Sequence, residues 1–235
     1  DLFTSRQLLA LTTLVRLVRM SHSGEAAGDV VSTLLALCVD RVADKCASLV
    51  FWHDSREFVD HVFARQALSM TWNFAEAPII ADVGWDGAVE WVTRICVDVS
   101  LASVPANQAG SAVSASATKH PLPDDVVQAF VTDPPYYDAV PYSDLSDFFY
   151  VWLKRSLPAS LLSTFANTLT PKDDECIVDE TKGKNHSYFE QTMQTAMAEG
   201  RRILAPDGVG IVVFAHKSTA GWESLLQAMV DAGWI

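Results

Sequence analysis

The sequence predicts an α/β protein in which a partial sheet of parallel strands follows a helical region. Residues 126–132 and 209–215 are short apolar runs, and each is followed by polar residues and then by a helical pattern. The order strand, loop, helix, helix, strand, helix is typical of parallel strands joined by right-handed crossovers. Apolar residues at 3.6-residue spacing within 5–20, 29–49 and 87–99 predict the preceding helices.

The helical region covers residues 1–101 in this prediction. Leu11 and Val15 belong to an apolar set that shares one face of the first helix. Asp29 is suited to cap the second helix, because its side chain can accept hydrogen bonds from main-chain N–H groups. Residues 51–76 are rich in aromatic side chains and are expected to be partly helical.

Residues 102–235 form the predicted α/β domain. The expected elements are a linker at 102–120 or, alternatively, a short edge strand near Val113, a strand at 126–132, a helix at 144–156, a loop at 157–186, a helix at 187–204, a turn at 206–208, a strand at 209–215 and a helix at 220–232. The last strand is continuously apolar, so we expect both its faces to be buried. Two strands are too few for a stable sheet, and a further strand is expected after Ile235. We therefore expect the chain to be an excerpt from a larger protein.

Composition restricts the class of protein. The chain has no run of eighteen apolar residues, so no membrane span is predicted, and its first residues lack the features of a signal peptide. Cys38 and Cys46 fall at apolar helical positions and form no CxxC pair, which indicates buried free thiols in a reducing cytoplasm. The histidines His22, His53 and His61 lack metal-ligand spacing, so no metal site is predicted.

The formal net charge of −12 disfavours nucleic-acid binding, because binders of nucleic acids normally carry basic patches. The adjacent basic pairs, such as Lys154-Arg155, do not form a basic stripe. If the protein binds DNA, we expect the electropositive surface to lie outside this chain.

The motif Asp133-Pro134-Pro135-Tyr136 directly follows the first predicted strand. Two consecutive prolines cannot continue a central strand, and they stiffen the loop at its carboxyl end, where open α/β sheets bind ligands. The Asp133 carboxylate and the following carbonyl can accept hydrogen bonds from an exocyclic amine, and the Tyr136 ring can stack on the base that carries it. The alternative is that the prolines only mark a turn.

Several segments resemble the large prokaryotic adenine-specific DNA methylases that begin with a domain of unknown function. The motif segment runs from Thr132 to Phe149, and the others are Leu2–Gln7, Arg65–Leu68, Trp72–Glu76, Gly84–Gly87, Pro121–Asp125 and Phe214–Thr219. The resemblance implies a Rossmann-like, S-adenosylmethionine-dependent methyltransferase sheet. It also implies methylation of a DNA base that is flipped from the duplex. The favoured target is N6 of adenine, and N4 of cytosine is the less favoured target.

The resemblance also assigns roles to residues. Asp133, Pro134, Pro135 and Tyr136 would form the catalytic loop. Tyr137, Asp138, Tyr142 and Asp144 would line the base or backbone channel, although Tyr142 can instead pack on helix 144–156. Lys217 follows a predicted strand at its carboxyl end and would contact a phosphate, with a solvated lysine as the alternative.

Asp133, Ser116 and Ala117 would lie against the cofactor. Relatives often carry an acidic residue where this chain has Ser114-Ala115-Ser116-Ala117. The glycine-rich cofactor loop of such enzymes is also missing, since Gly208 and Gly210 open a strand rather than a helix. We therefore expect a half-site, with the amine pocket present and the fragment alone inactive.

Two other functions remain open. One is methylation of RNA or of a protein glutamine; such enzymes commonly have Asn as the first motif residue, so Asp133 favours a nucleic-acid amine. The other is a non-catalytic module of a defence system, such as a restriction-modification complex with partner proteins, which the missing glycine loop favours.

Overall fold

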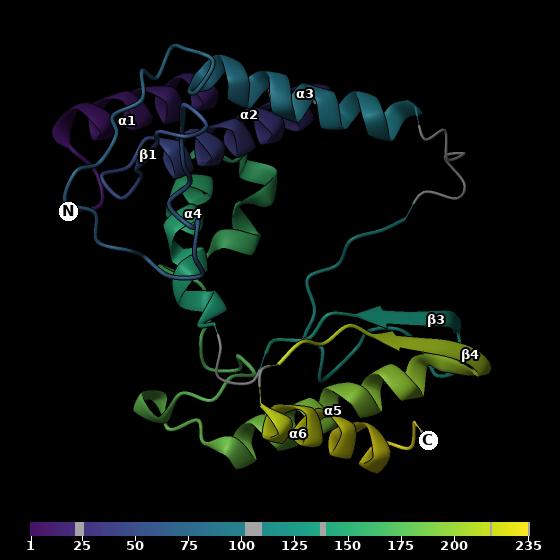
Figure 1. Ribbon diagram of the computed structural model, residues 1–235. Helices are drawn as coiled ribbons and strands as arrows, with labels where there is room; N and C mark the ends of the chain where they lie inside the picture. The colour runs from purple at the N-terminus through teal and green to yellow at the C-terminus, as the bar shows by residue number, and fades with distance from the viewer. Residues whose placement is uncertain (22–25, 102–109, 137–139, 217, 235) are drawn as a thin grey trace. The chain divides into compact units, whose positions relative to one another are not determined.

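The computed structural model describes residues 1–21, 26–101, 110–136, 140–216 and 218–234. The chain divides into two compact units. The helical unit consists of Asp1–Ala109 and Tyr142–Lys172, and the α/β unit consists of Gly110–Pro141 and Asp173–Ile235. Both units are visible in Figure 1, and each is described here by itself.

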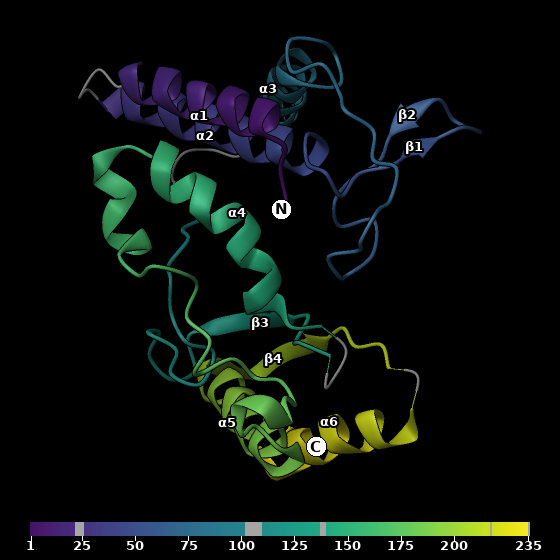
Figure 2. The same ribbon diagram turned by 90° about the vertical axis from the view of Figure 1, so that its left-hand side faces the viewer.

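The helical unit is built on α1 (Ser5–Met20), α2 (Ala26–Lys45), α3 (Trp85–Leu101) and α4 (Tyr142–Ser156). Helices α1 and α2 lie side by side in Figures 1 and 2. Thr4 begins α1 with a capping box, in which its hydroxyl accepts from the Gln7 N–H and the Gln7 side chain accepts from the Thr4 N–H. Leu11 and Val15 are buried on the inner face of α1, as the apolar spacing predicts. Asp29 lies in the first turn of α2 rather than at its cap.

Helix α4 belongs to the helical unit, although the sequence-based boundary placed it with the α/β domain. Its buried aromatic residues Phe148 and Trp152 explain this assignment. The ring centroids of both lie 5.5 Å from that of Phe3, and Phe63 contacts Phe148 edge to face at 5.3 Å. Because these rings complete the core formed by α1 and α2, the chain returns to the helical unit after residue 141.

The prediction of helix within residues 51–76 is wrong. This stretch contains a short antiparallel hairpin, β1 (Trp52–His53) and β2 (Phe58–Val59), followed by irregular chain. Main-chain hydrogen bonds fix it in the extended form, from Asp60 N–H to the Phe51 carbonyl at 3.0 Å and from Ala75 N–H to the Val50 carbonyl at 2.9 Å. Aromatic residues pack well on pleated strands, so their abundance did not indicate a helix.

The α/β unit contains the parallel pair β3 (Val127–Thr132) and β4 (Leu204–Val212), with α5 (His186–Ile203) and α6 (Thr219–Asp231). Both helices lie on the same side of the strand pair in Figures 1 and 2. The core between them contains Phe189, Met193 and Met197 from α5, and Leu225 from α6. The predicted parallel strands and their intervening helix are therefore confirmed.

Strand β4 differs from the prediction in two respects. It begins directly after α5, and a register irregularity between its pairings to Val127 and Ala129 takes the place of the predicted turn at 206–208. Burial of this strand on both faces was also predicted wrongly. Val209, Ile211 and Val213 are 61%, 51% and 50% exposed, because α5 and α6 cover only the opposite face.

The other connections are irregular. The loop after α4 contains the 3-10 helices η2 (Ala159–Phe165) and η3 (Glu180–Lys182). Val113 lies outside any strand and is 71% exposed, so the predicted edge strand does not form there. Within the described part of the chain, no helix is both long and apolar enough to cross a bilayer.

Candidate active site at the end of strand β3

The Asp-Pro-Pro motif lies at the carboxyl end of β3. Thr132 is the last residue of this strand, and its carbonyl accepts a hydrogen bond from Val213 N–H at 2.8 Å, which extends the ladder to the start of the motif. Pro134 is buried and Asp133 is exposed. The chain therefore holds the proline ring in place and leaves the preceding carboxylate accessible, as the sequence predicts for this position.

A cavity of about 400 Å³ lies beside the motif. One wall is formed by Asp133, Pro134 and Pro135, and the opposite wall by side chains of α5 that include Thr192 and Met193. Ser116 and Ala117, which the sequence pairs with Asp133 as cofactor contacts, line the same cavity although no regular element carries them. The fold thus brings three separate segments of the α/β unit to one cavity.

Close packing of α5 on β3 closes the floor of the cavity. Gly200 of α5 faces the Phe130 ring, and a Cβ atom at this glycine would lie only 2.6 Å from the ring. The Trp234 indole also packs on Phe130, with ring centroids 5.5 Å apart, and donates to the Met197 carbonyl at 2.8 Å. A larger residue here would therefore displace the Phe130 ring or move the helix away from the strand that carries the motif.

Arg202 fixes the segment that leads into β3. Its guanidinium donates to Asp124 at 2.6 Å, to Glu199 at 2.9 Å and to the His120 carbonyl at 3.1 Å. These hydrogen bonds raise the pKa of Arg202, and the bond from Arg202, with one from the main chain of His120, lowers the pKa of Glu199 to about 2. Both groups stay charged across the physiological range, so the entry to β3 keeps one geometry.

The polar lining of the cavity consists mainly of carboxylate and hydroxyl groups. Among the described residues, none donates to the Asp133 carboxylate, and Asp174 adds a second carboxylate to the lining. Burial raises the pKa of the Cys176 thiol to about 12, so this cysteine is neutral and is no nucleophile. The combination of carboxylates with an apolar wall suits a planar apolar group that carries N–H donors.

Tyr136 belongs to a group of aromatic rings at the carboxyl ends of β3 and β4. Its ring meets Phe214 edge to face, with centroids 5.6 Å apart, and Trp222 meets the same phenylalanine edge to face at 5.2 Å. The His216 ring lies parallel to Phe214 at 6.2 Å. Trp222 was not predicted as part of the site. The sequence feature that could have indicated Trp222 is its position four residues after Ser218, the cap of α6, which places it at the start of the helix.

Tyr136 is not among the residues that line the cavity, and the remaining predicted site residues belong to the helical unit or lie outside the described residues. Tyr142 is the first residue of α4, in the helical unit, and is 39% exposed. Tyr142 therefore belongs to this helix itself. Its alternative predicted role was to pack on the same helix. Tyr137, Asp138 and Lys217 lie outside the described residues.

The cavity fits only part of S-adenosylmethionine. Its volume lies within the usual range for small-molecule sites, roughly 300–1,000 Å³. The sole basic group in its described lining is His120, and the Nδ1 atom of this histidine already accepts a bond from Leu122 N–H at 3.2 Å. No lysine or arginine of the described lining is present to pair with the carboxylate of that cofactor. Among the described residues there is also no glycine-rich turn from a strand into a helix.

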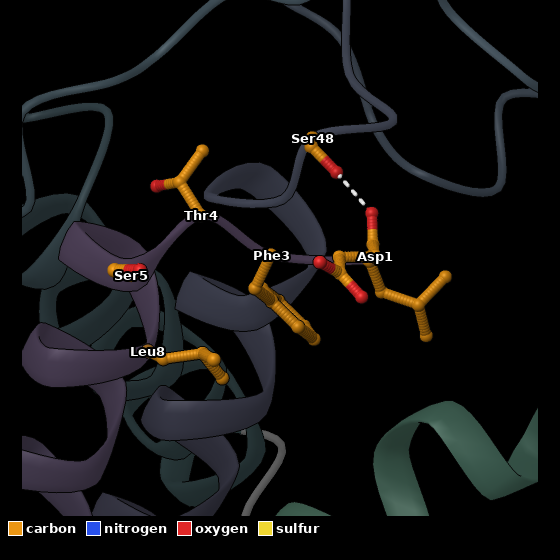
Figure 3. A pocket seen from close by; sticks show the side chains of 7 residues that line it. Asp1, Phe3, Thr4, Ser5, Leu8 and Ser48 are labelled. Carbon is orange, nitrogen blue, oxygen red and sulfur yellow. Dashed lines mark hydrogen bonds between the residues drawn. The ribbon is translucent and has the colours of Figure 1, made fainter.

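A separate cavity of about 500 Å³ lies where α1 begins (Figure 3). Its lining includes Phe3, Thr4, Leu8 and Ser48, and the Ser48 hydroxyl donates to the Asp1 carbonyl at 2.8 Å. None of the predicted site residues lies there, and Thr4 is already used as the cap of α1.

Searches of protein-family models, of curated proteins and of solved structures find nothing that matches this chain. The geometry of the cavity beside Asp133 is therefore the basis for assigning a function.

Proposed function

We propose that this chain forms the target-amine side of an S-adenosylmethionine-dependent DNA amino-methyltransferase, with N6 of adenine as the methyl acceptor. The observation that carries the proposal is the position of Asp133. Its carboxylate is exposed at the carboxyl end of a parallel strand, has no donor among the described residues, and borders a largely apolar cavity of about 400 Å³. Such an acceptor is suited to an N–H group of a planar base.

The residues of the motif would divide the work between them. The amine lone pair is delocalised into the base, so the amine is a poor nucleophile. Hydrogen bonds from the amine to Asp133 and to the Pro134 carbonyl would localise the lone pair and stabilise charge that develops on nitrogen. Pro135 would limit motion of the loop, and Tyr136, held edge to face by Phe214, would stack on the flipped base.

The bare face of the sheet supports a larger Rossmann-like fold. Parallel sheets are normally covered by helices on both faces, whereas Val209, Ile211 and Val213 are at least half exposed here. We propose that further strands and helices of the full-length protein cover this face and bind the methyl donor. The buried thiols Cys38 and Cys46 suit a reducing compartment such as the cytoplasm.

Asp133 favours a nucleic-acid amine over a protein glutamine, because the enzymes that methylate glutamine commonly have Asn at this motif position. RNA and the N4 amine of cytosine present the same N–H donors and remain alternative targets. A non-catalytic module of a defence complex is the second candidate function. The observation that favours it is the lack of a cation in the described cavity lining to pair with the cofactor carboxylate.

Transfer of a labelled methyl group from S-adenosylmethionine to DNA by the full-length protein tests the proposal. Asp133→Ala is expected to lower the rate by about 100-fold or more, the range seen when a transition-state hydrogen bond is removed. Asp207→Ala is the matched control, since Asp207 is also exposed in the α/β unit and does not line the cavity. Equal rates for the native protein and Asp133→Ala would refute the assigned role.

A further inference from the structure

The β1–β2 hairpin of the helical unit borders a second cavity, of about 430 Å³. Every residue that lines it comes from the stretch 49–71. The polar residues of the lining are Asp60, His61, Arg65, Ser69 and Thr71. The described residues contain no group of three or more His, Cys, Asp and Glu side chains that could hold a metal ion.

His61 is held rigidly in the cavity wall. Its Nδ1 atom lies 2.5 Å from a carboxylate oxygen of Asp44, and its main-chain N–H donates to the Asp60 carboxylate at 2.9 Å. The second carboxylate oxygen of Asp44 accepts from Val62 N–H at 3.1 Å. A carboxylate at Nδ1 fixes the tautomer and the ring orientation of a histidine, so the Nε2 edge of His61 remains for a ligand.

Both carboxylates near the cavity are already paired. Asp44 is shared between His61 and Val62, and Asp60 accepts from His61 N–H and lies 3.0 Å from Nε2 of His53. Hydrogen bonds therefore hold both carboxylates in place, and the positive charge of Arg65 stands against their negative charge in the same cavity.

Arg65 lines the cavity and forms no ion pair with a carboxylate of the described residues. Arg6, Arg94 and Arg202, by contrast, form such ion pairs. The hydroxyl group of Ser69 lines the same cavity as Arg65. A guanidinium presents several N–H donors in a planar fork that matches the oxygens of a phosphate.

The walls of this cavity are preformed. The Thr71 hydroxyl donates to the Leu49 carbonyl at 3.0 Å and ties the two ends of the lining stretch together. The N–H of Asp60 donates to the Phe51 carbonyl and closes the hairpin. A site that is ordered before binding loses little conformational freedom when the ligand arrives.

We propose that this cavity binds a phosphate group through Arg65, the Nε2 edge of His61 and the Ser69 hydroxyl. The arrangement places a cation, an oriented imidazole and a hydroxyl donor in one preformed cavity, and its two carboxylates are occupied by imidazole and main-chain N–H groups. The phosphate belongs either to a nucleic-acid backbone or to a free phosphate ester.

Side-chain NMR of the 235-residue chain tests this site with sodium phosphate, compared with sodium chloride at equal ionic strength. We expect saturable shifts of the His61 imidazole and Arg65 Nε signals. Arg65→Gln should weaken phosphate binding at least tenfold, a change of about 1.4 kcal/mol. His61→Gln is the second variant and should also weaken it. Arg56→Gln is the control, because Arg56 is an exposed arginine between β1 and β2 that does not line the cavity, and it should change the affinity less than twofold.

The source of the phosphate follows from two further titrations, with adenosine monophosphate and with a short DNA duplex. Tighter binding of the duplex that depends on Arg65 assigns the site to a nucleic-acid backbone. Tighter binding of the nucleotide that depends on Arg65 assigns it to a free phosphate ester. Absence of any binding that depends on Arg65, or an equal loss in Arg56→Gln, would overturn the proposal. These titrations need no methyl donor and should be unaffected by Asp133→Ala, so they stand or fall independently of the proposed methylation.

Discussion

The two cavities use the same side chain, aspartate, in opposite ways. In the α/β unit, Asp133 has no donor among the described residues and faces a largely apolar cavity. In the helical unit, Asp44 pairs with His61, which lines the second cavity, and Asp60 pairs with His53. An aspartate without a partner can receive a ligand N–H group directly, whereas a paired aspartate acts through the residue it holds. The carboxylate's partners, rather than its residue type, decide its role.

A third kind of aspartate gives the largest expected effect on stability. Asp40 in α2 is buried, one of its oxygens has no hydrogen-bond partner among the described residues, and burial raises its pKa to about 8. Because the folded pKa lies above the ordinary value of 3.8, the unfolded chain loses this proton first as the pH rises. The protonated Asp40 carboxyl makes its full contribution to the free energy of unfolding at low pH. This contribution declines from about pH 4 and is lost by about pH 8.

Asp40→Asn removes this dependence. We expect the variant to be more stable than the native chain at pH 8 by roughly 3–5 kcal/mol, the upper end corresponding to about 1.4 kcal/mol for each unit of pKa shift. The two proteins should be alike near pH 4. Urea unfolding of both at pH 4, 6 and 8 measures the difference, and an unchanged difference across this range would show that Asp40 is ionised in the folded state.

Replacing the paired and the unpaired aspartate should separate their roles. Asp44→Ala removes charge-assisted hydrogen bonds from His61 and Val62, so we expect the free energy of unfolding to fall by about 1.5–3 kcal/mol. Asp133→Ala removes no hydrogen bond or ion pair among the described residues and should change stability by less than about 0.5 kcal/mol. Urea unfolding at pH 7 compares them. Equal decreases in the free energy of unfolding for the two variants would contradict the different roles assigned to Asp44 and Asp133.

Close approach of α5 to β3 can be tested at Gly200. Gly200→Ala places a methyl group against the Phe130 ring and should cost about 1–3 kcal/mol through overpacking. Phe130→Leu in the same chain makes room and should recover part of the loss, which a double-mutant cycle measures. Strict additivity of the two changes would mean that these residues do not press on each other.

The smallest expected difference concerns Tyr136. Tyr136→Phe keeps the ring and its edge-to-face contact with Phe214, so methylation by the full-length protein should change little. Tyr136→Ala removes the stacking surface and should weaken binding of the target base by about 1–3 kcal/mol. Steady-state kinetics with DNA distinguishes them, and similar losses in both variants would assign the role to the hydroxyl group.

Much of the fold could be predicted because its helices have one-sided apolar faces. The limits of α1 match the predicted helix at 5–20, and β3 lies within the predicted strand at 126–132. The return of α4 to the helical unit could not be predicted. It depends on the contact of Phe148 with Phe3, two residues that are 145 positions apart in the sequence. Local periodicity carries no information about such distant partners.

The two sites differ in the same way. The Asp133 loop could be predicted because its four residues are adjacent in sequence. The second cavity could not, since Asp44 and His61 are separated by 17 positions and meet only through the hairpin, which was predicted as helix. Trp222 was missed for a related reason, because its contact with Phe214 depends on how α6 returns to the strand end.

The most direct test of the central claim is the identity of the methylated nucleoside. DNA incubated with the full-length protein and S-adenosylmethionine is digested to nucleosides and measured by mass spectrometry. The account predicts N6-methyladenine with the native protein and with Asp207→Ala, and its loss with Asp133→Ala. Formation of N6-methyladenine at the native rate by Asp133→Ala, or no methylated base with the native protein, would contradict it.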